Sequence, residues 1–358
     1  MRDTVMSTGT EAHGSAPAPL SVLDLSVVGE RAGAVEALTQ TVALAQEAER
    51  LGYRRLWVAE HHSYPASASP APAVLLAHLA AVTRRIRLGS GGVMLINHAP
   101  LVIVEQFGVL DTLYPGRIDL GVGRAPGGLP TVAQALRRPS DDPGPDAFEA
   151  QMEEVLGFLG AGPGFPAGHP YRRDQVHVVP AATGLPVWML GSGTTGARVA
   201  ARLGLPFVAA HHINAAQVSR AIEVYREEFR PSATLSEPYL MVSANVVCAG
   251  TEAEALAHAR SRPLMLTLAR QGKLTTLPSP ETAAAYPYTD EERQVAEELL
   301  ASGVHGTPDQ VRAGLTELRE STGADELMLV SMIHDFPARL RSLTLVAEEF
   351  ALDCGSGD

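Results

Sequence analysis

The chain has 358 residues and is acidic, with a formal net charge of −12 and a sequence pI near 5.5. Its composition, 46% hydrophobic and 19% charged residues, is typical of a globular protein with a large core, and no apolar run is long enough to cross a bilayer. Binding to nucleic acid or to an anionic membrane requires clustered Lys and Arg, so this charge balance predicts neither partner.

The first segment, 1–19, is rich in Ala, Gly, Pro, Ser and Thr and lacks the basic start and the apolar stretch of a signal peptide. We predict a disordered N-terminal tail over 1–19 and a single domain over 20–353. The two cysteines, Cys248 and Cys354, indicate neither a disulfide framework nor a thiolate metal site. We therefore expect a cytoplasmic protein.

Eight short apolar runs, each followed by a helix-like segment, alternate along this domain. The expected strands are 20–27, 55–60, 86–95, 118–122, 186–190, 206–210, 239–248 and 326–332. The expected helices are 34–51, one opened by Pro70 and Pro72, 101–114, 148–159, 194–203, 215–229, 252–270, 308–321 and 336–351. Eight such pairs predict an α/β fold, a (β/α)8 TIM barrel with loop insertions, rather than a doubly wound sheet. The long loops 124–145 and 272–289 would then be lids or substrate-binding segments.

The second expected strand is the most informative segment, because its sequence RLWVAEHH ends in Glu60, His61 and His62. In parallel α/β folds the chemistry gathers at the carboxyl ends of the strands. An imidazole titrates near neutral pH, and a neighbouring carboxylate can hold its tautomer or tune its pKa. These three residues are therefore the candidates for catalysis.

The third and fourth strands carry glycines where branched residues are usual. In the third strand, Gly89, Gly91 and Gly92 indicate a bulge or a close approach of the backbone to a flat ligand, or else a tight bend of the barrel without a ligand. The fourth strand ends in GVGRAPGG, with Arg124 just beyond it. A guanidinium among glycines suits a phosphate, although a solvated surface arginine would have the same pattern.

The fifth strand runs into a loop of small and hydroxylated residues that opens a helix. The loop contains Gly191, Ser192, Gly193, Thr194 and Thr195. The amides and the dipole of a helix N-terminus favour an anion, and the hydroxyl groups could add donors; an ordinary helix cap is the alternative. A phosphate site late in a barrel is a recurrent feature of this architecture, which favours the anion site.

Five motifs, in order, resemble those of the bacterial luciferase-like flavin-dependent monooxygenase family, in its single-chain branch. They are RLWVAEHH, RIRLGSGGVML, NHAP, FGVLDTLYPGRIDLGVGRAPGG and GSGTTGARVAARLGLPFV, and the resemblance extends from residue 20 to about residue 346. It implies a barrel that binds reduced FMN, reacts with O2 and oxidises a small, largely apolar organic substrate through a flavin C4a-(hydro)peroxide.

The resemblance assigns roles to the ends of the second and third strands. His61 matches the active-site histidine, with Glu60 and His62 beside it. Gly91 and Gly92 match a bulge whose non-prolyl cis peptide bond backs the flavin ring.

The resemblance also assigns the FMN phosphate to the fourth and fifth strand ends. Arg124 matches the arginine that meets the phosphate, and the loop 191–195 completes the phosphate site. The segment 272–289 matches a mobile loop over the active site. One departure is Gly123, which stands where the light-emitting enzymes carry a reactive cysteine, so light emission is not implied.

The resemblance implies a homodimer. Because no G-x-G-x-x-G fingerprint follows the first strand, we expect a separate flavin reductase to supply the reduced FMN.

Three alternatives stay open. A deazaflavin (F420)-dependent hydride-transfer oxidoreductase would use the same barrel, and a non-catalytic relative would bind FMN without oxidising a substrate. A metal-dependent hydrolase would draw ligands from His61, His62, His98, His211 and His212, but adjacent histidines point to opposite faces of a strand, so no metal is expected.

Overall fold

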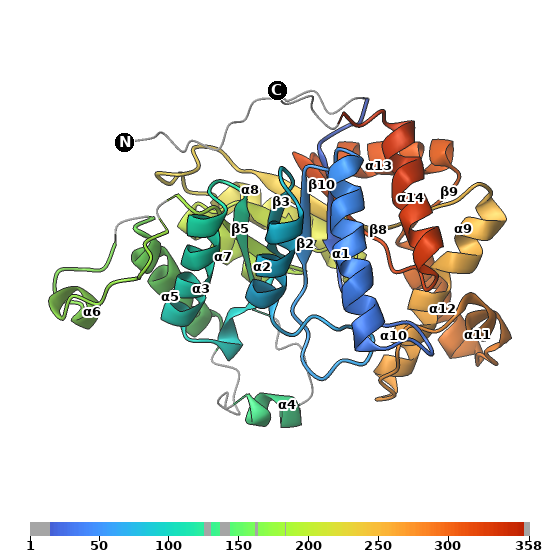
Figure 1. Cartoon of the computed structure of the whole chain (residues 1–358), viewed down its shortest axis with the longest axis horizontal. Helices are drawn as coiled ribbons and strands as arrows, with labels where there is room; N and C mark the ends of the chain where they lie inside the picture. Colours follow the sequence, from blue (N-terminus) through green and yellow to red (C-terminus); the bar gives the residue numbers. More distant parts are fainter. Residues whose placement is uncertain (1–14, 125–129, 137–143, 162–163, 183, 354–358) are drawn as a thin grey trace.

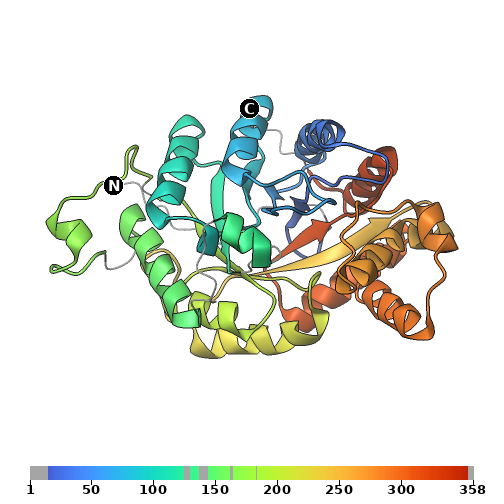
Figure 2. The ribbon, with the colours of Figure 1, turned by 90° about the horizontal axis from the view of Figure 1, so that it is seen from below.

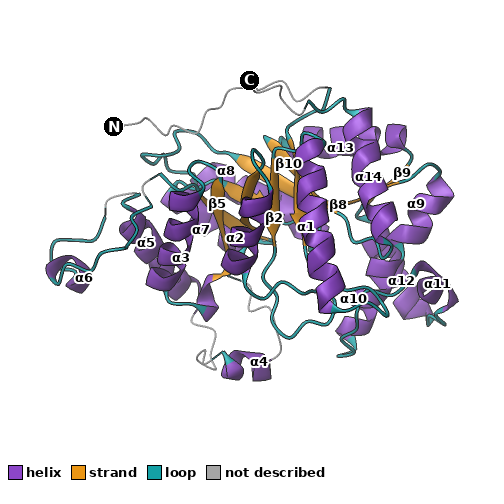
Figure 3. Ribbon diagram, in the orientation of Figure 1, coloured by secondary structure: helices purple, strands orange, loops and turns teal. Residues whose placement is uncertain are grey.

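Eight parallel strands close into a barrel in the computed structural model, which describes residues 15–124, 130–136, 144–161, 164–182 and 184–353. The barrel strands are β1 (Leu20–Asp24), β2 (Arg55–Val58), β3 (Arg87–Ser90), β5 (Ile118–Gly123), β6 (Val187–Gly191), β7 (Phe207–Ala209), β8 (Leu240–Cys248) and β10 (Glu326–Val330). Closure comes from β10, which pairs with both β1 and β8. Figure 3 shows the strands inside a layer of helices. The predicted (β/α)8 barrel is confirmed.

Two further strands lie beyond the barrel strands. The expected strand 86–95 is divided at Gly91 and Gly92 into β3 and the short β4 (Val93–Met94), which pairs with β5. The strand β9 (Val304–Gly306) pairs with the end of β8 and was not predicted, because three residues are too few for a periodicity signal.

The helices that alternate with the strands form the outer layer (Figure 2). They are α1 (Ala34–Arg50), α2 (Pro72–Val82), α3 (Pro100–Leu113), α5 (Gly144–Leu159), α7 (Thr194–Leu203), α8 (Ala215–Glu228), α13 (Pro308–Thr322) and α14 (Phe336–Glu349). Short or inserted helices are η1 (Leu95–Asn97), α4 (Pro130–Ala135), α6 (Pro170–Arg173), α9 (Glu252–Ala259), α10 (Ser261–Arg270), α11 (Pro280–Ala285) and α12 (Asp290–Ala301). The expected helix 252–270 is two helices, because Pro263 lacks the N–H that would continue the hydrogen-bond ladder.

Both long loops contain more structure than the sequence predicts. The first includes α4 and the start of α5, and its segments 125–129 and 137–143 lie outside the described residues. The second includes α11, and its Leu277 is fully buried and hydrogen-bonded through its backbone to Val28 and Glu30. The predicted loop 272–289 therefore contains one short helix, and backbone pairing and burial of Leu277 hold it against the segment after β1.

The barrel interior is apolar in its middle. Trp57 and Trp188 are both fully buried and meet edge to face, with ring centroids 5.4 Å apart, and Tyr239 packs against Trp188. Both tryptophans are therefore core residues. This apolar layer separates two polar ends of the barrel.

The beginning and the end of the described chain lie side by side. The backbone N–H of Ser15 donates to the carbonyl of Phe350 at 2.7 Å. The rest of the expected tail, residues 1–14, lies outside the described residues, as does Cys354. Within the described ranges, no helix combines the length and apolar character needed to span a membrane.

Candidate active site

All the residues that the sequence predicts for the site lie at the carboxyl ends of four strands that are neighbours in the sheet. Their order around the barrel is β2, β3, β5 and β6. In Figure 1 this end of the barrel faces downward, and Figure 2 looks onto it. The closure of the barrel thus brings together residues that are up to 135 positions apart, from Glu60 to Thr195.

Glu60 is the centre of a buried polar cluster. Its Oε1 accepts hydrogen bonds from Nε2 of His62 and Nε2 of His98, each at 2.8 Å, and its Oε2 accepts from the backbone N–H of Met94 at 3.0 Å. Burial alone would raise the pKa of Glu60, but the hydrogen bonds and charges of these partners hold it below its ordinary value. The carboxylate therefore stays ionised and ties the end of β2 to β4. It makes no hydrogen bond to His61, so the predicted role of fixing the His61 tautomer was wrong.

His61 is held by its backbone, whose N–H donates to the carbonyl of Ser69 at 2.9 Å. Its ring lies 5.5 Å from that of Tyr64, and its Nδ1 is buried without a hydrogen-bond partner among the described residues. Burial lowers the pKa of His61, and the nearby charge of Glu60 offsets this only in part. The imidazole is therefore neutral at pH 7 and can accept a proton.

The same cluster is a geometrically possible metal site. The ligand atoms of Glu60, His62 and His98 all lie within 4.8 Å of one another, and in the described part of the chain this is the one such group of three. The other candidates, His211 and His212, follow β7 and do not join it. The set of five histidine ligands considered for a hydrolase is therefore not assembled. The three groups satisfy one another by hydrogen bonds.

The glycines after β3 are required by close packing inside the barrel. The peptide bond between Gly91 and Gly92 is cis, as the resemblance implies. A Cβ atom on Gly91 would lie 2.6 Å from Cδ1 of Leu23, and one on Gly92 would lie 3.0 Å from the carbonyl oxygen of Gly121. A larger residue would displace these neighbours, so the bulge depends on glycine.

The strand ends of β5 and β6 and the start of α7 lie side by side and hold the residues that the sequence predicts for a phosphate, and we call this segment the cradle. Because Gly123 pairs with Leu190, Arg124 follows directly opposite Gly191. The N-cap of α7 is Gly193, and no side chain caps this end of the helix. The first amides of α7 therefore remain available to an anion, and the helix dipole favours one.

This cradle also depends on small residues. A Cβ atom on Gly191 would lie 3.3 Å from Cα of Gly196, and the reverse distance is the same. The loop between them carries the three hydroxyl side chains that the sequence predicts as donors, and each of them is partly exposed. They are Ser192, Thr194 and Thr195.

Four residues at this end were not predicted from the sequence. They are Tyr64, His98 as a partner of Glu60, Asn245 and Arg262. Arg262 of α10 and Asn245 of β8 both donate hydrogen bonds to the carbonyl of His212, the latter at 3.2 Å. Neither belongs to a motif, and α10 has the pattern of an ordinary amphipathic helix, so no local signal identifies them.

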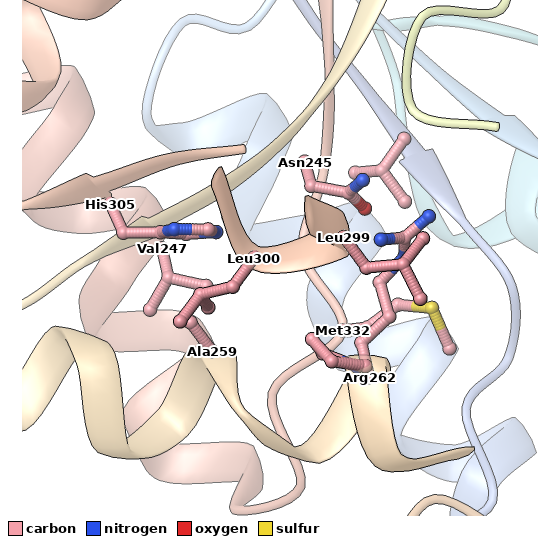
Figure 4. A pocket seen from close by; sticks show the side chains of 10 residues that line it. Asn245, Val247, Ala259, Arg262, Leu299, Leu300, His305 and Met332 are labelled. Atoms are coloured by element: carbon pink, nitrogen blue, oxygen red, sulfur yellow. The ribbon is translucent and has the colours of Figure 1, made fainter. Parts of the chain in front are cut away.

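A narrow cavity lies beside Arg262 and Asn245 (Figure 4). His305 enters it from the opposite side, and Leu299 and Leu300 of α12 line it between the two sides. Its volume is about 10 Å³, which is the space of about one water molecule and far too small for a flavin.

Comparison with known proteins gives a consistent result. The family model described as luciferase-like monooxygenase matches residues 19–326. A luciferase-like monooxygenase of Escherichia coli (strain K12) is 40% identical over 332 residues, covering 92% of this chain and 96% of that protein. The N-acetyl-S-alkylcysteine monooxygenase of Bacillus subtilis (strain 168) is 36% identical over 335 residues, covering 92% and 97%. The crystal structure of apo-MsnO8 superposes with a TM-score of 0.84 at 40% identity, covering 94% of this chain and 99% of the other.

Proposed function

The chain belongs to the luciferase-like monooxygenase family and is an oxidoreductase of that class, and from this premise we propose that it uses reduced FMN and O2 to oxygenate a small, largely apolar organic substrate. One observation carries the choice of cofactor. The N-terminus of α7, which has no side-chain cap, follows β6 and lies beside Arg124, which follows β5. On its other side β5 pairs with β3, whose end carries the bulge at Gly91 and Gly92. An anion site in line with a side-chain-free stretch of backbone suits a molecule with a phosphate and a flat ring system.

The residues of the chain would bind, orient and protect this cofactor. When bound, reduced FMN supplies the electrons that activate O2. The amides of α7 and the Arg124 guanidinium would bind the phosphate, and the backbone at Gly91 and Gly92 would lie against the ring. The His61 Nδ1, buried and without a partner in the described residues, would accept or return the proton that the oxygenation requires.

The substrate that we propose to test first is a thioether. The relative from Bacillus subtilis is named for the oxygenation of N-acetyl-S-alkylcysteine, a thioether, and it is similar over almost its whole length. A thioether sulfur would gain one oxygen atom of O2 and become a sulfoxide, and the second oxygen atom would leave as water with the two electrons that reduced FMN supplies. The substrate would bind at the carboxyl end of the barrel, near His61.

Reduced FMN would come from a separate flavin reductase, because the segment after β1 lacks a dinucleotide-binding fingerprint. The test mixes the full chain with FMN, NADH and a flavin reductase and measures sulfoxide formation from N-acetyl-S-alkylcysteines. Product that requires both proteins supports the two-component proposal. Product formed from NADH without the reductase contradicts it.

The cofactor itself is tested by binding photoreduced FMN to the chain without oxygen and mixing with oxygenated buffer in a stopped-flow instrument. We expect reoxidation that is slower than that of free FMN and that passes through a spectrum distinct from those of reduced and oxidised flavin. Reoxidation as fast as that of free FMN contradicts the proposal, and binding of F420 would then be measured. Tight FMN binding without substrate oxidation would instead indicate a non-catalytic flavin protein.

We also propose that the chain forms a homodimer through α1, α2 and α3. Large apolar side chains are exposed on these adjacent helices, at 84% for Val35, 73% for Val74 and 62% for Leu113. A groove of about 450 Å³, lined mainly by apolar residues, lies between α1 and α2. Such a patch is typical of a protein interface. Light scattering should show a dimer that Val74→Arg converts to a monomer, whereas Val179→Arg, at an exposed site elsewhere, should stay dimeric.

A further inference from the structure

Arg262 is a buried cation without a carboxylate partner. Arg262 is only 8% exposed, and its Nη2 donates a hydrogen bond to the backbone carbonyl of His212. The other buried arginines of the described chain are paired: Arg55 with two carboxylates at 2.7 Å each, and Arg339 with Asp24 at 3.5 Å. Arg262 makes no ion pair with any described residue.

The surroundings of Arg262 leave its charge uncompensated. Burial lowers the pKa of Arg262 to about 10, so the group still carries its charge at pH 7. The adjacent histidines are neutral at this pH, because burial and the charge of Arg262 lower the pKa of His212 to about 3 and that of His305 to about 4. An isolated buried charge is costly, and an anion that binds beside it would remove that cost.

Asn245 provides an unsatisfied acceptor next to this cation. Its Nδ2 and the Arg262 guanidinium donate to the same carbonyl oxygen, so the two side chains are close neighbours, as Figure 4 shows. The Oδ1 of Asn245 is buried without a hydrogen-bond partner among the described residues. The pair therefore offers donors for an anion and an acceptor for one N–H or O–H group.

Arg262 lies on the side of the barrel mouth where His61 is found. The ring of His61 is 5.5 Å from that of Tyr64, and the Tyr64 hydroxyl is 3.8 Å from Sδ of Met265. Met265 is one turn after Arg262 in α10. A molecule whose anionic end meets Arg262 can therefore place its apolar part over Met265 and Tyr64, toward His61.

We propose that Arg262 binds the carboxylate of the substrate and that Asn245 Oδ1 accepts a hydrogen bond from a donor beside that carboxylate. The substrate class is then a small organic acid with an apolar, oxidisable part, such as an N-acyl amino acid. This inference rests on the proposed function for the fate of the substrate, but binding of the carboxylate does not depend on the flavin.

The test measures binding by calorimetry to the full chain without flavin. The probes are hexanoate, benzoate and N-acetylmethionine, each beside its neutral amide or methyl ester. We expect at least one carboxylate to bind ten or more times more tightly than its neutral counterpart. Arg262→Gln should lose at least tenfold of that affinity, and Arg270→Gln, an exposed arginine on the same helix, should keep it. No preference for any carboxylate, or the same preference in Arg262→Gln, overturns the proposal.

Thermal unfolding without ligand distinguishes a binding role from a structural one. If the charge of Arg262 is uncompensated, Arg262→Leu keeps or raises the unfolding temperature of the wild-type chain. A clear fall would show that Arg262 holds the fold and would overturn the proposal. FMN titration of the same variants distinguishes failure of this inference from failure of the proposed function. Unchanged FMN binding without carboxylate binding contradicts only this inference. Carboxylate binding without FMN binding contradicts only the proposed function.

Discussion

The two ends of the barrel differ in how completely their buried charges are paired. At the amino end, Arg55 forms a forked pair with Glu326, at 2.7 and 3.0 Å, and a further bond to Asp119 at 2.7 Å. Arg87 adds a second cation on Asp119 at 2.6 Å, and Tyr239 adds a hydroxyl on Glu326 at 3.1 Å. Every charge in this set has an opposite partner.

At the carboxyl end, Glu60 is paired with two histidines, but one other charge and several polar atoms have no partner among the described residues. Arg262 has no carboxylate among the described residues, and buried polar atoms of His61, His211 and Asn245 have no partner there. Such groups cost stability unless a ligand satisfies them. Titratable groups at the amino end thus hold strands in register, and the proposals above assign the unpaired groups at the carboxyl end to ligand binding, as the functional asymmetry of barrel folds would require.

The largest expected effect is at the amino end. Arg55→Leu would leave Asp119 and Glu326 buried with one cation fewer, and we expect it to lower the free energy of unfolding by about 3–5 kcal/mol. Urea unfolding followed by circular dichroism measures this change. The matched control is Arg54→Leu, because Arg54 is 22% exposed and lies 3.8 Å from Glu326. A similar loss in both variants would contradict the assignment of stability to the Arg55 network.

The next effect separates activity from stability at the carboxyl end. We expect His61→Ala to reduce substrate oxidation about a hundredfold or more, because the proton acceptor is lost, with little change in FMN binding or unfolding temperature. Steady-state product assays, FMN titration and thermal unfolding measure the three quantities. His177→Ala, at an exposed histidine outside the barrel mouth, is the control. Unchanged turnover would remove His61 from the chemistry.

The two ends should also lose stability in different pH ranges. Burial lowers the pKa of His212 to about 3, so the unfolded chain binds its proton first and stability falls as the pH drops below about 6.5. Arg87 and Arg55 outweigh the effect of burial and hold the pKa of Asp119 at about 2, so its contribution is present above pH 4 and is lost as the pH falls toward 2. Each slope is about 1.4 kcal/mol per pH unit.

Unfolding free energies measured from pH 8 to pH 2 test this separation. His212→Gln should reduce the slope in the upper range, where His305 still contributes, and leave the lower range unchanged, whereas Asp119→Asn should reduce the slope in the lower range. If each variant changed both ranges equally, the two ends would not titrate independently.

The smallest effect concerns the phosphate cradle. We expect Arg124→Ala to weaken FMN binding about tenfold, since one charge-assisted contact is lost while the amides of α7 remain. Fluorescence titration measures the affinity, and Arg202→Ala, at the far end of α7, serves as the control. Equal FMN affinity in the two variants would place the phosphate elsewhere.

The sequence by itself determined the barrel and which of its ends holds the candidate site residues. Alternation of apolar strands with amphipathic helices is a local pattern, and a polar residue directly after a buried strand is visible without a structure. Glu60 and His61 after β2, the glycines after β3, and Arg124 after β5 were all predicted from such local signals and lie at one end of the barrel.

Only the tertiary structure decided which of these groups meet. Glu60 is hydrogen-bonded to His98, which is 38 positions away, and not to the adjacent His61, because closure of the barrel sets β4 beside the end of β2. Arg262 meets the carbonyl of His212 across 50 positions for the same reason. Hydrogen-bond partners and burial depend on distances between segments that no local pattern encodes, so contacts of this kind become visible only when the barrel closes.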